Sequence, residues 1–438
     1  MAQTDYAHAA RTFEEAYANT DYRLPLRGDQ LDQFYVARAE DTSRLEMLKQ
    51  ELLIGAEKGL STKFLVTGHL GCGKSTELNR LVRDIAKEPG LRDSLFVVSY
   101  SASDVLDLQD VDYTDIAFSI VAGVYDRLRE LDITFSSDTI EQITAWINRE
   151  VESFTSKTLG AEVEIGSGAG FGRLLGMMNL IGIRISGSGE RSKEVRKKVK
   201  KRAPELRDLV NNLMTELREL TGMSVLLVID DLDKLRKDDA LQVFREDGPF
   251  LTLLDCMAIY TAPVSMMYQL GESPSFERYR RYPIPMFKVA SQNGSAAGDD
   301  LERLVEMVHR RVSPDLFAPS VVEKLAVISG GVVRHLIKMV QDGCLYCQTF
   351  QHPLIDREVL IWLLERLKED FSRWLGQADY EVLKRIHRTK SCRDAEEAWE
   401  YLQSLCVLEY ANGGYWYDLH PVVSILIGER ESRQEESA

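Results

Sequence analysis

Residues 68–75 read G-x-x-x-x-G-K-S, and this spacing of glycine, lysine and hydroxyl side chains suits a bound polyphosphate. The loop follows the short apolar run 64–66 and precedes a helical pattern. Glycines let the backbone curl until its N–H groups face phosphate oxygens, and the following helix N-terminus adds partial positive charge. The residues that we expect to contact the nucleotide are Gly68, Gly71, Cys72, Gly73, Lys74, Ser75 and Thr76.

Two side chains of this loop have specific chemistry. Lys74 can bridge the β- and γ-phosphates, where it would also assist the transfer reaction. The hydroxyl of Ser75 can bind Mg²⁺. We therefore predict that Lys74 is catalytic and that Ser75 is a metal ligand.

A group of carboxylates follows the apolar run 225–229. Asp230 and Asp231 come directly after this run, and Asp233 follows two positions later. Parallel α/β sheets bind their ligands at the carboxyl ends of the strands, so a strand here would deliver carboxylates to that edge. We expect Asp230 to hold Mg²⁺ and Asp231 to orient or deprotonate the attacking water, with Asp233 as the alternative. By itself the group would equally suit a solvated acidic turn.

The elements that must position these residues follow from apolar periodicity. Helical patterns cover most of 1–60, 114–155, 204–221 and 301–375, and the turn signal 412–414 joins two hairpin arms at 407–410 and 415–419. The expected strands lie at 64–66, 95–100, 225–229, 258–260 and 284–289. This alternation predicts an α/β core that is followed by a helical region.

Composition restricts the class of protein further. The net charge of −15 repels nucleic acid and anionic membranes unless basic residues cluster, and the run 196–202 is such a cluster. Six cysteines in 438 residues do not make a disulfide framework. The first residues show no signal peptide, and no uncharged apolar run is long enough to span a membrane. A cytoplasmic protein is the simplest expectation.

The phosphate loop, the paired aspartates, the strand between them and the helical tail with a hairpin together resemble the AAA+ ATPases. The resemblance is greater to their signal-transducing STAND branch and to the related origin-recognition ATPases. It implies ATP or ADP and Mg²⁺ as cofactors, and slow, regulated ATP hydrolysis. It also implies an α/β P-loop NTPase core with a parallel sheet, followed by an α-helical lid and a winged-helix domain.

The resemblance implies the following division of the chain. An N-terminal helical segment with an adenine-contacting element covers 1–60, and the ATPase core covers 61–295 with a Gly-rich insertion at about 156–203. The lid would then cover 296–352, the winged-helix domain 353–430 and a disordered tail 431–438.

Further site residues come from the same resemblance. Residues 35–40 are similar to the adenine-contacting element, which implies nucleotide contacts for Val36 and Arg38, although Ala37 stands where that element has glycine. Thr261 occupies the place of a polar residue that senses the γ-phosphate, and it could equally be a capping hydroxyl. Arg334 resembles the lid arginine that reaches the phosphates.

Two more assignments concern charged side chains. Arg280 and Arg281, with Arg278, precede the expected fifth strand, where this class carries a catalytic finger arginine; a solvated basic face is the alternative. His420 stands where STAND switches place a histidine that contacts the ADP β-phosphate, but Pro421 replaces the usual aspartate. A histidine that merely begins a terminal helix would look the same.

Two functions remain open on this basis. One is a molecular switch that controls its own assembly or a separate effector or sensor protein, and the resemblance suggests bacterial antiphage defence as its setting. The other is a DNA-binding initiator or loader. The helix that would enter the major groove, 393–400, carries Asp394, Glu396, Glu397 and Glu400, which would oppose DNA phosphates. We therefore favour the switch.

Overall fold

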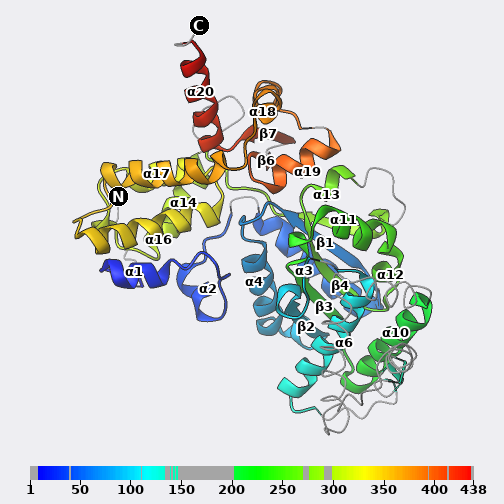
Figure 1. Cartoon of the computed structure of the whole chain (residues 1–438). Coiled ribbons are helices and arrows are strands. Elements are labelled where there is room, and N and C mark those ends of the chain that lie inside the picture. The colour runs from blue at the N-terminus through cyan, green and yellow to red at the C-terminus, as the bar shows by residue number, and fades with distance from the viewer. Residues whose placement is uncertain are drawn as a thin grey trace, which may run out of the picture. The chain divides into compact units, whose positions relative to one another are not determined.

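The computed structural model describes residues 8–38, 41–109, 111–133, 139, 142–143, 145–146, 202–269, 276–290, 298–392, 394–411 and 414–435. The chain divides into two compact units, whose elements are labelled in Figure 1. Unit 1 comprises Met1–Glu46, Thr67–Arg83 and Pro283–Ala438. Unit 2 comprises Met47–Val66 and Asp84–Tyr282.

A five-stranded sheet forms the core of unit 2. Its strands are β1 (Lys63–Gly68), β2 (Leu95–Ser101), β3 (Ser224–Asp230), β4 (Met257–Pro263) and β5 (Tyr279–Pro283), in the order β2-β3-β4-β1-β5. β3 pairs in parallel with β2 and β4, with Val98 opposite Leu227 and Val228 opposite Ile259. Strands buried on both faces read as continuous apolar runs, which is why the sequence identifies them readily.

The strands expected at 64–66, 95–100, 225–229 and 258–260 are confirmed. The fifth strand was placed wrongly at 284–289, because β5 ends at Pro283. β5 lies at the edge of the sheet and exposes Arg280 and Arg281, so it lacks the apolar run that marks an interior strand. The expected segment contains Pro285, which has no N–H for a ladder.

Helices pack around this sheet. α10, which is confirmed where the sequence predicted it, buries Leu206, Val210 and Leu213 and ends at Gly222, whose φ is +70°. The described helices of unit 2 are the greater part of α3 (Asp41–Lys58), α5 (Pro89–Arg92), α6 (Tyr113–Glu130), α10 (Ala203–Thr221), α11 (Lys237–Leu241), α12 (Gly248–Thr252) and α13 (Met266–Gln269). The described residues of this unit also form a π-helical turn, η3 (Gln242–Glu246), and the 3-10 turns η1 (Ala102–Asp104), η2 (Leu232–Lys234) and η4 (Phe276–Arg278).

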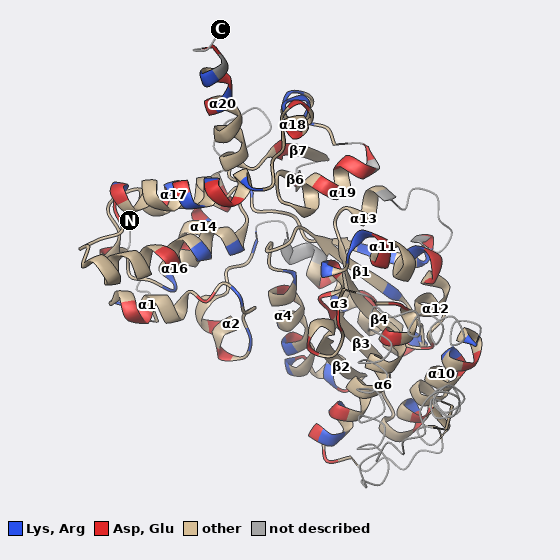
Figure 2. Ribbon diagram, in the orientation of Figure 1, with Lys and Arg blue, Asp and Glu red and all other residues tan. Residues whose placement is uncertain are grey.

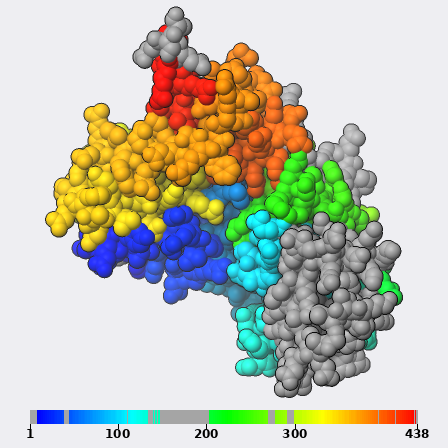
Figure 3. Space-filling model, in the orientation of Figure 1, coloured from blue at the N-terminus to red at the C-terminus, as the bar shows by residue number. Residues whose placement is uncertain are grey.

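Unit 1 is largely helical. Its elements are α1 (Phe13–Asn19), α2 (Asp29–Phe34), most of α4 (Lys74–Lys87), α14 (Gly298–His309), η5 (Pro314–Leu316), α15 (Val321–Ile328), α16 (Val333–Phe350), α17 (Arg357–Ser372), α18 (Gln377–Thr389), α19 (Ala395–Gln403), β6 (Val407–Ala411), β7 (Tyr415–Leu419) and α20 (Pro421–Glu435). The N-terminal segment packs on the later helices, as the blue and yellow surfaces of Figure 3 show. Ala10 and Arg311 share a backbone hydrogen bond, and Gln341 donates to Tyr17 O.

β6 and β7 form an antiparallel hairpin, called the C-terminal hairpin below. Both of its arms are confirmed where the sequence predicted them, and residues 412–413 of its turn lie outside the described residues. α20 continues through Glu435, so the expectation of disorder from residue 431 was wrong for 431–435. The assignment of these elements to a lid and a winged helix stays a prediction.

Some expectations fall on residues that the structure does not describe. The Gly-rich insertion expected at 156–203 lies outside the described residues except for its last two, and the basic run 196–202 lies outside except for Arg202. Among the helices that are described, none combines the length and the apolar character needed to cross a bilayer.

Candidate nucleotide site

The phosphate loop leaves β1 at Gly68 and enters α4 at Lys74. Gly71 and Gly73 have φ values of +74° and +106°, a region that L side chains rarely adopt. A Cβ at Gly71 would lie 2.7 Å from the Cβ of Arg334. The two glycines are thus required both by the curl of the loop and by the close approach of another segment of unit 1.

Lys74 is buried and folds back over the loop. Its Nζ donates to the carbonyl oxygens of Gly68 and His69, each at 2.8 Å. Ser75, the next residue, is partly exposed. A loop with a buried ammonium group and a nearby hydroxyl can neutralise phosphate charge and add one oxygen ligand for Mg²⁺.

Arg38 packs against the phosphate loop. It donates to the carbonyl oxygen of Cys72 and to Glu77 Oε1 at 3.0 Å, and its guanidinium lies 4.6 Å from the ring centroid of Phe287. The side chains of Arg38 and Glu77 are only 5% and 8% exposed, so this ion pair is buried. Val36, named with Arg38 for adenine contact, is also buried. Their contact with adenine stays a prediction, whereas the structure assigns Arg38 a role in holding the loop.

The N-terminus of α16 also meets the loop. The backbone N–H of Arg334 donates to Gly71 O at 3.1 Å, which satisfies one of the N–H groups that a helix leaves unpaired at its first turn. Within the described part of the chain, no hydrogen bond or ion pair engages the Arg334 guanidinium. The chain enters α16 through Gly331, whose φ is +83° and where a Cβ would lie 1.9 Å from Phe287 O. Arg334 therefore lies against the phosphate loop through its backbone, and the contact of its side chain with the phosphates stays a prediction.

The C-terminal hairpin contacts the loop as well. The side chain of Cys72 is fully buried in an apolar cluster with residues of the hairpin and its surroundings. The other members of this cluster are Ile284, Met286, Val332, Leu405, Leu408, Tyr410 and Trp416. Tyr410 further donates its hydroxyl hydrogen to Gly330 O at 2.8 Å. The loop thus packs against a segment more than 300 residues later in the chain.

His420 lies in the interior of unit 1. Its Nε2 is 3.1 Å from Nδ1 of His335, and its Nδ1 accepts from the N–H of Val422 at 3.3 Å. Burial and the neighbouring His335 keep the pKa of His420 well below its usual value. Both ring nitrogens are therefore engaged by protein groups in this structure, and contact with an ADP phosphate stays a prediction.

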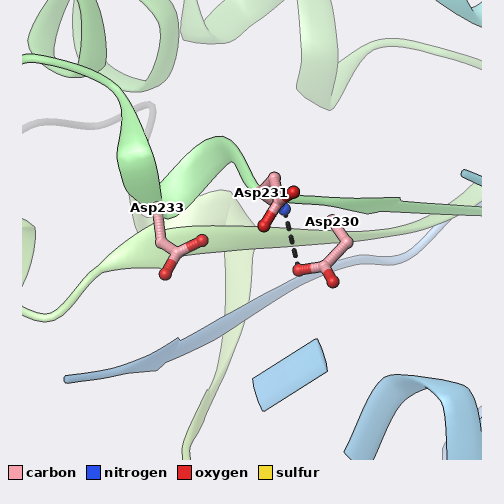
Figure 4. Close-up of side chains that lie close together, drawn as sticks. All are labelled: Asp230, Asp231 and Asp233. Atoms are coloured by element: carbon pink, nitrogen blue, oxygen red, sulfur yellow. Dashed lines mark hydrogen bonds between the residues drawn. The ribbon is translucent and has the colours of Figure 1, made fainter. Parts of the chain in front are cut away.

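The acidic turn, residues 230–233, begins at the last residue of β3 in unit 2 (Figure 4). Asp231 turns the chain with a φ of +68°, a conformation that aspartate tolerates better than most residues. Its Oδ2 accepts hydrogen bonds from Ser101 and Ser103, both at 2.6 Å, and its Oδ1 lies 2.6 Å from Lys234 Nζ. Neighbouring strand ends and one local lysine thus fix this carboxylate.

These partners set the charge of Asp231. Burial opposes ionisation, but the hydrogen bonds from Lys234, Ser101 and Ser103 more than offset it and lower the pKa of the carboxyl. A carboxylate with a lowered pKa is a weak base, so the arrangement suits orientation of water better than removal of its proton. The catalytic role of Asp231 stays a prediction.

Thr261 supports the same turn. Its buried hydroxyl oxygen accepts from the N–H of Leu232 at 3.0 Å, which ties the end of β4 to the residue after Asp231. This is the capping role that the sequence left open, and its phosphate-sensing role stays a prediction. Asp230, Asp231 and Asp233 each have a carboxylate oxygen within 4.8 Å of the others, as the three ligands of one cation would.

Residues 50–246 match the KAP family P-loop domain. This region is a P-loop NTPase domain. The whole chain is similar in structure to Orc1 of Aeropyrum pernix in complex with DNA, at 12% identity and a TM-score of 0.41, covering 91% of this chain and 94% of that one. It is also similar to Cdc6p of Pyrobaculum aerophilum, at 14% identity and a TM-score of 0.42, covering 93% and 100%. No curated protein matches the sequence.

The arginines proposed as fingers lie within β5, the strand at one edge of the sheet, rather than before it. Arg280 is 65% exposed at its side chain and pairs with Glu51 of α3 at 3.2 Å, while Arg281 is exposed. The expectation that they precede strand five was wrong, because both belong to β5. Their exposure agrees with the solvated-face alternative, and a role in assembly stays a prediction.

Several residues of the P-loop NTPase site were missed by the sequence reasoning. Ser101 could have been predicted, because this residue directly follows an expected strand, and parallel sheets bind ligands at the carboxyl ends of their strands. Glu77 and Lys234 look like ordinary helix and turn charges, and His69 occupies a variable position of the loop motif. Glu77 and His69 acquire their roles from contacts with segments far away in the sequence, whereas Lys234 pairs with Asp231 three residues earlier.

The charge on α19 bears on nucleic-acid binding. Asp394 caps this helix by accepting from the N–H groups of Glu396 and Glu397, and Glu397 pairs with Arg385. Figure 2 shows acidic residues along α19. An acidic helix lacks the positive charge that docking into a DNA groove requires.

Proposed function

We propose that this chain is an ATP-binding and slowly hydrolysing molecular switch, in which the C-terminal hairpin responds to the nucleotide at the phosphate loop. The observation that carries the proposal is the burial of Cys72, in the middle of the loop, in one apolar cluster with Leu408, Tyr410 and Trp416. A loop packed in this way cannot change conformation without changing the hairpin's packing, because protein interiors are close-packed.

Each site residue then has a defined role. Lys74 binds the β- and γ-phosphates, and Ser75 and Asp230 hold Mg²⁺. Asp231 orients the attacking water, with Asp233 as the alternative, and Arg334 senses the γ-phosphate from the first turn of α16. In support, Arg334 lies against Gly71 through its own backbone N–H.

The switch acts on other molecules through an oligomer of itself or through a separate effector or sensor protein. The resemblance to the AAA+ and STAND ATPases suggests antiphage defence as its setting. The carboxylates of α19 weigh against duplex DNA as the partner, since they would face the phosphates of a docked groove.

The first experiment measures thermal unfolding with ATP and Mg²⁺ for wild type and Lys74→Ala. Nucleotide at about 100 times its dissociation constant stabilises a fold by about 2.7 kcal/mol, so the wild type should show a clear shift in Tm and the variant almost none. Phosphate release on the same samples tests hydrolysis. Equal shifts for both proteins, or no shift for the wild type, would contradict nucleotide binding at this loop.

A second experiment tests the switch itself. The mass of the protein in solution is measured with ADP and with a non-hydrolysable ATP analogue. Limited proteolysis of the C-terminal hairpin is carried out under the same two conditions. Both the assembled mass and the cleavage rate should differ between the two nucleotides. The affinity for a DNA duplex is measured alongside, at two salt concentrations. Tight and steeply salt-dependent binding, with no effect of nucleotide on the hairpin, would favour a DNA-binding ATPase instead.

A further inference from the structure

His69, the second residue of the phosphate loop, is bonded to the C-terminal segment through both nitrogens of its ring. Nδ1 lies 3.2 Å from the carbonyl oxygen of Leu402, near the end of α19. Nε2 lies 2.7 Å from the backbone nitrogen of Glu409 in β6. The side chain is 2% exposed, so water does not compete for these bonds.

The partners determine which tautomer is present. A backbone N–H can only donate, so Nε2 must be unprotonated to accept from Glu409, and Nδ1 must carry the hydrogen that it donates to Leu402. Burial agrees with this, because it lowers the pKa of the imidazole to about 3. The ring is therefore neutral at physiological pH, and both of its polar atoms are satisfied.

The same residue is held by the nucleotide-binding lysine. Lys74 Nζ donates to the backbone carbonyl of His69 at 2.8 Å. If Lys74 binds phosphate as proposed above, it must redirect its hydrogen bonds toward that ligand. His69 is thus joined to Lys74 through its backbone carbonyl and to the C-terminal hairpin through Nε2 of its ring.

We propose that His69 is a positioning residue that couples the phosphate loop to the C-terminal hairpin through its Nδ1–H and Nε2. This inference rests on the proposed function and names the contact through which that switch is regulated. A change at Lys74 moves the His69 backbone and weakens the two ring hydrogen bonds. Because coupling between sites is reciprocal, loss of these bonds in turn changes nucleotide release.

Three substitutions separate the two hydrogen bonds. The amide of His69→Asn lies near the Nδ1 position and can still donate to Leu402 O. The amide oxygen of His69→Gln lies near the Nε2 position and can still accept from Glu409, whereas His69→Ala keeps neither bond. His352→Ala is the matched control, because this histidine pairs with Asp356 at the start of α17, away from the phosphate loop in the sequence.

Two measurements are made on each full-length protein: amide hydrogen exchange of residues 407–411, and the release rate of a fluorescent ADP. The loss of one hydrogen bond changes an equilibrium constant by about two- to tenfold. Because His69→Ala loses two, it should speed amide exchange about 5- to 50-fold and change the rate of ADP release by a similar factor. His69→Gln should restore the protection of the Glu409 amide better than His69→Asn, and the control should match wild type.

The outcomes distinguish this inference from the function on which it rests. Failure of wild type to bind ADP or ATP would remove the proposed function, while the exchange data would still report whether His69 holds the hairpin. Normal nucleotide binding with wild-type exchange and release in His69→Ala would overturn the coupling. Faster exchange with unchanged ADP release in all three variants would also overturn it, because His69 would then serve packing alone.

Discussion

The phosphate loop and the acidic turn after β3 are secured in different ways. Distant parts of the chain hold the loop: Arg38 precedes it, and Arg334 and Glu409 follow it by more than 250 residues. Strand ends of one sheet hold the acidic turn, through the hydroxyl groups of Ser101 and Thr261, together with the local lysine at position 234.

This difference has a consequence for regulation. Contacts made by the sheet persist as long as the core of unit 2 is folded, so the acidic turn is a fixed part of the domain. Contacts between separate segments of unit 1 can be made or released without unfolding the sheet. We therefore expect changes in the C-terminal segment to affect the phosphate loop more than the acidic turn.

The largest expected effect comes from breaking the buried ion pair at the loop. Arg38→Met removes one of the charged partners of the buried Glu77 and leaves Arg80 at 3.7 Å and the Tyr35 hydroxyl, so the loss of unfolding free energy should lie near the lower end of the about 3–5 kcal/mol typical of a broken buried ion pair. Urea denaturation followed by tryptophan fluorescence measures this, since four of the five tryptophans belong to unit 1. The double variant Arg38→Met, Glu77→Leu should recover part of the loss. A loss below 1 kcal/mol in the single variant would contradict the importance of this pair.

The next effect concerns hydrolysis at the acidic turn. Asp231→Asn keeps an oxygen for Ser101 and Ser103 but loses the charge, so ATP affinity should stay within a few-fold while hydrolysis falls about 100-fold. Phosphate release and fluorescent-ATP binding measure the two quantities. Asp233→Asn is the parallel variant. Wild-type hydrolysis in Asp231→Asn with slow hydrolysis in Asp233→Asn would transfer the role to Asp233.

A smaller effect is a pH dependence of the stability of unit 1, which contains the phosphate loop. Burial lowers the pKa of His69 to about 3 and that of His335 to about 4. As pH falls below 6.5 the unfolded chain binds protons first, so stability is complete above 6.5 and declines toward 4. Between pH 6.5 and pH 5, each of these histidines should lower the free energy of unfolding by about 1.5 kcal/mol.

Urea denaturation across this pH range tests the contribution of these histidines, and carboxylates remain charged over most of it. His69→Gln combined with His335→Gln removes two of the histidines with lowered pKa values and should make the profile less steep, while His420 and His309 keep their share of it. An equally steep profile in the double variant would assign the pH dependence to other groups.

The smallest effect is expected from the exposed partner of the acidic turn. Lys234 is 42% exposed at its side chain, so Lys234→Met should change the unfolding free energy by no more than about 1 kcal/mol. The difference between the losses of unfolding free energy in Lys234→Met and Arg38→Met measures how differently the acidic turn and the phosphate loop are stabilised. A loss as large as that of Arg38→Met would remove the contrast.

Much of the core could be predicted from the sequence because its signals are local. Runs of buried β-branched and aliphatic residues marked four strands, and the spacing of Gly68, Gly73 and Lys74 marked the phosphate loop. The hairpin was found from its turn signal at 412–414 and the arms on either side. β5 was misplaced because an edge strand with exposed arginines has no such apolar signal.

The sequence by itself determined the chemical types at the site: a glycine-rich loop of the kind that suits phosphates, a lysine and a hydroxyl within it, and carboxylates at a strand end. Only the tertiary structure decided how they are held. His69 and Glu77 have no distinctive local pattern, and they become structural partners of the loop because Glu409 and Arg38 reach them in the folded chain. A motif is defined by the spacing of a few neighbouring residues along the chain. Burial and hydrogen-bond partners, in contrast, depend on segments that are far apart in the sequence.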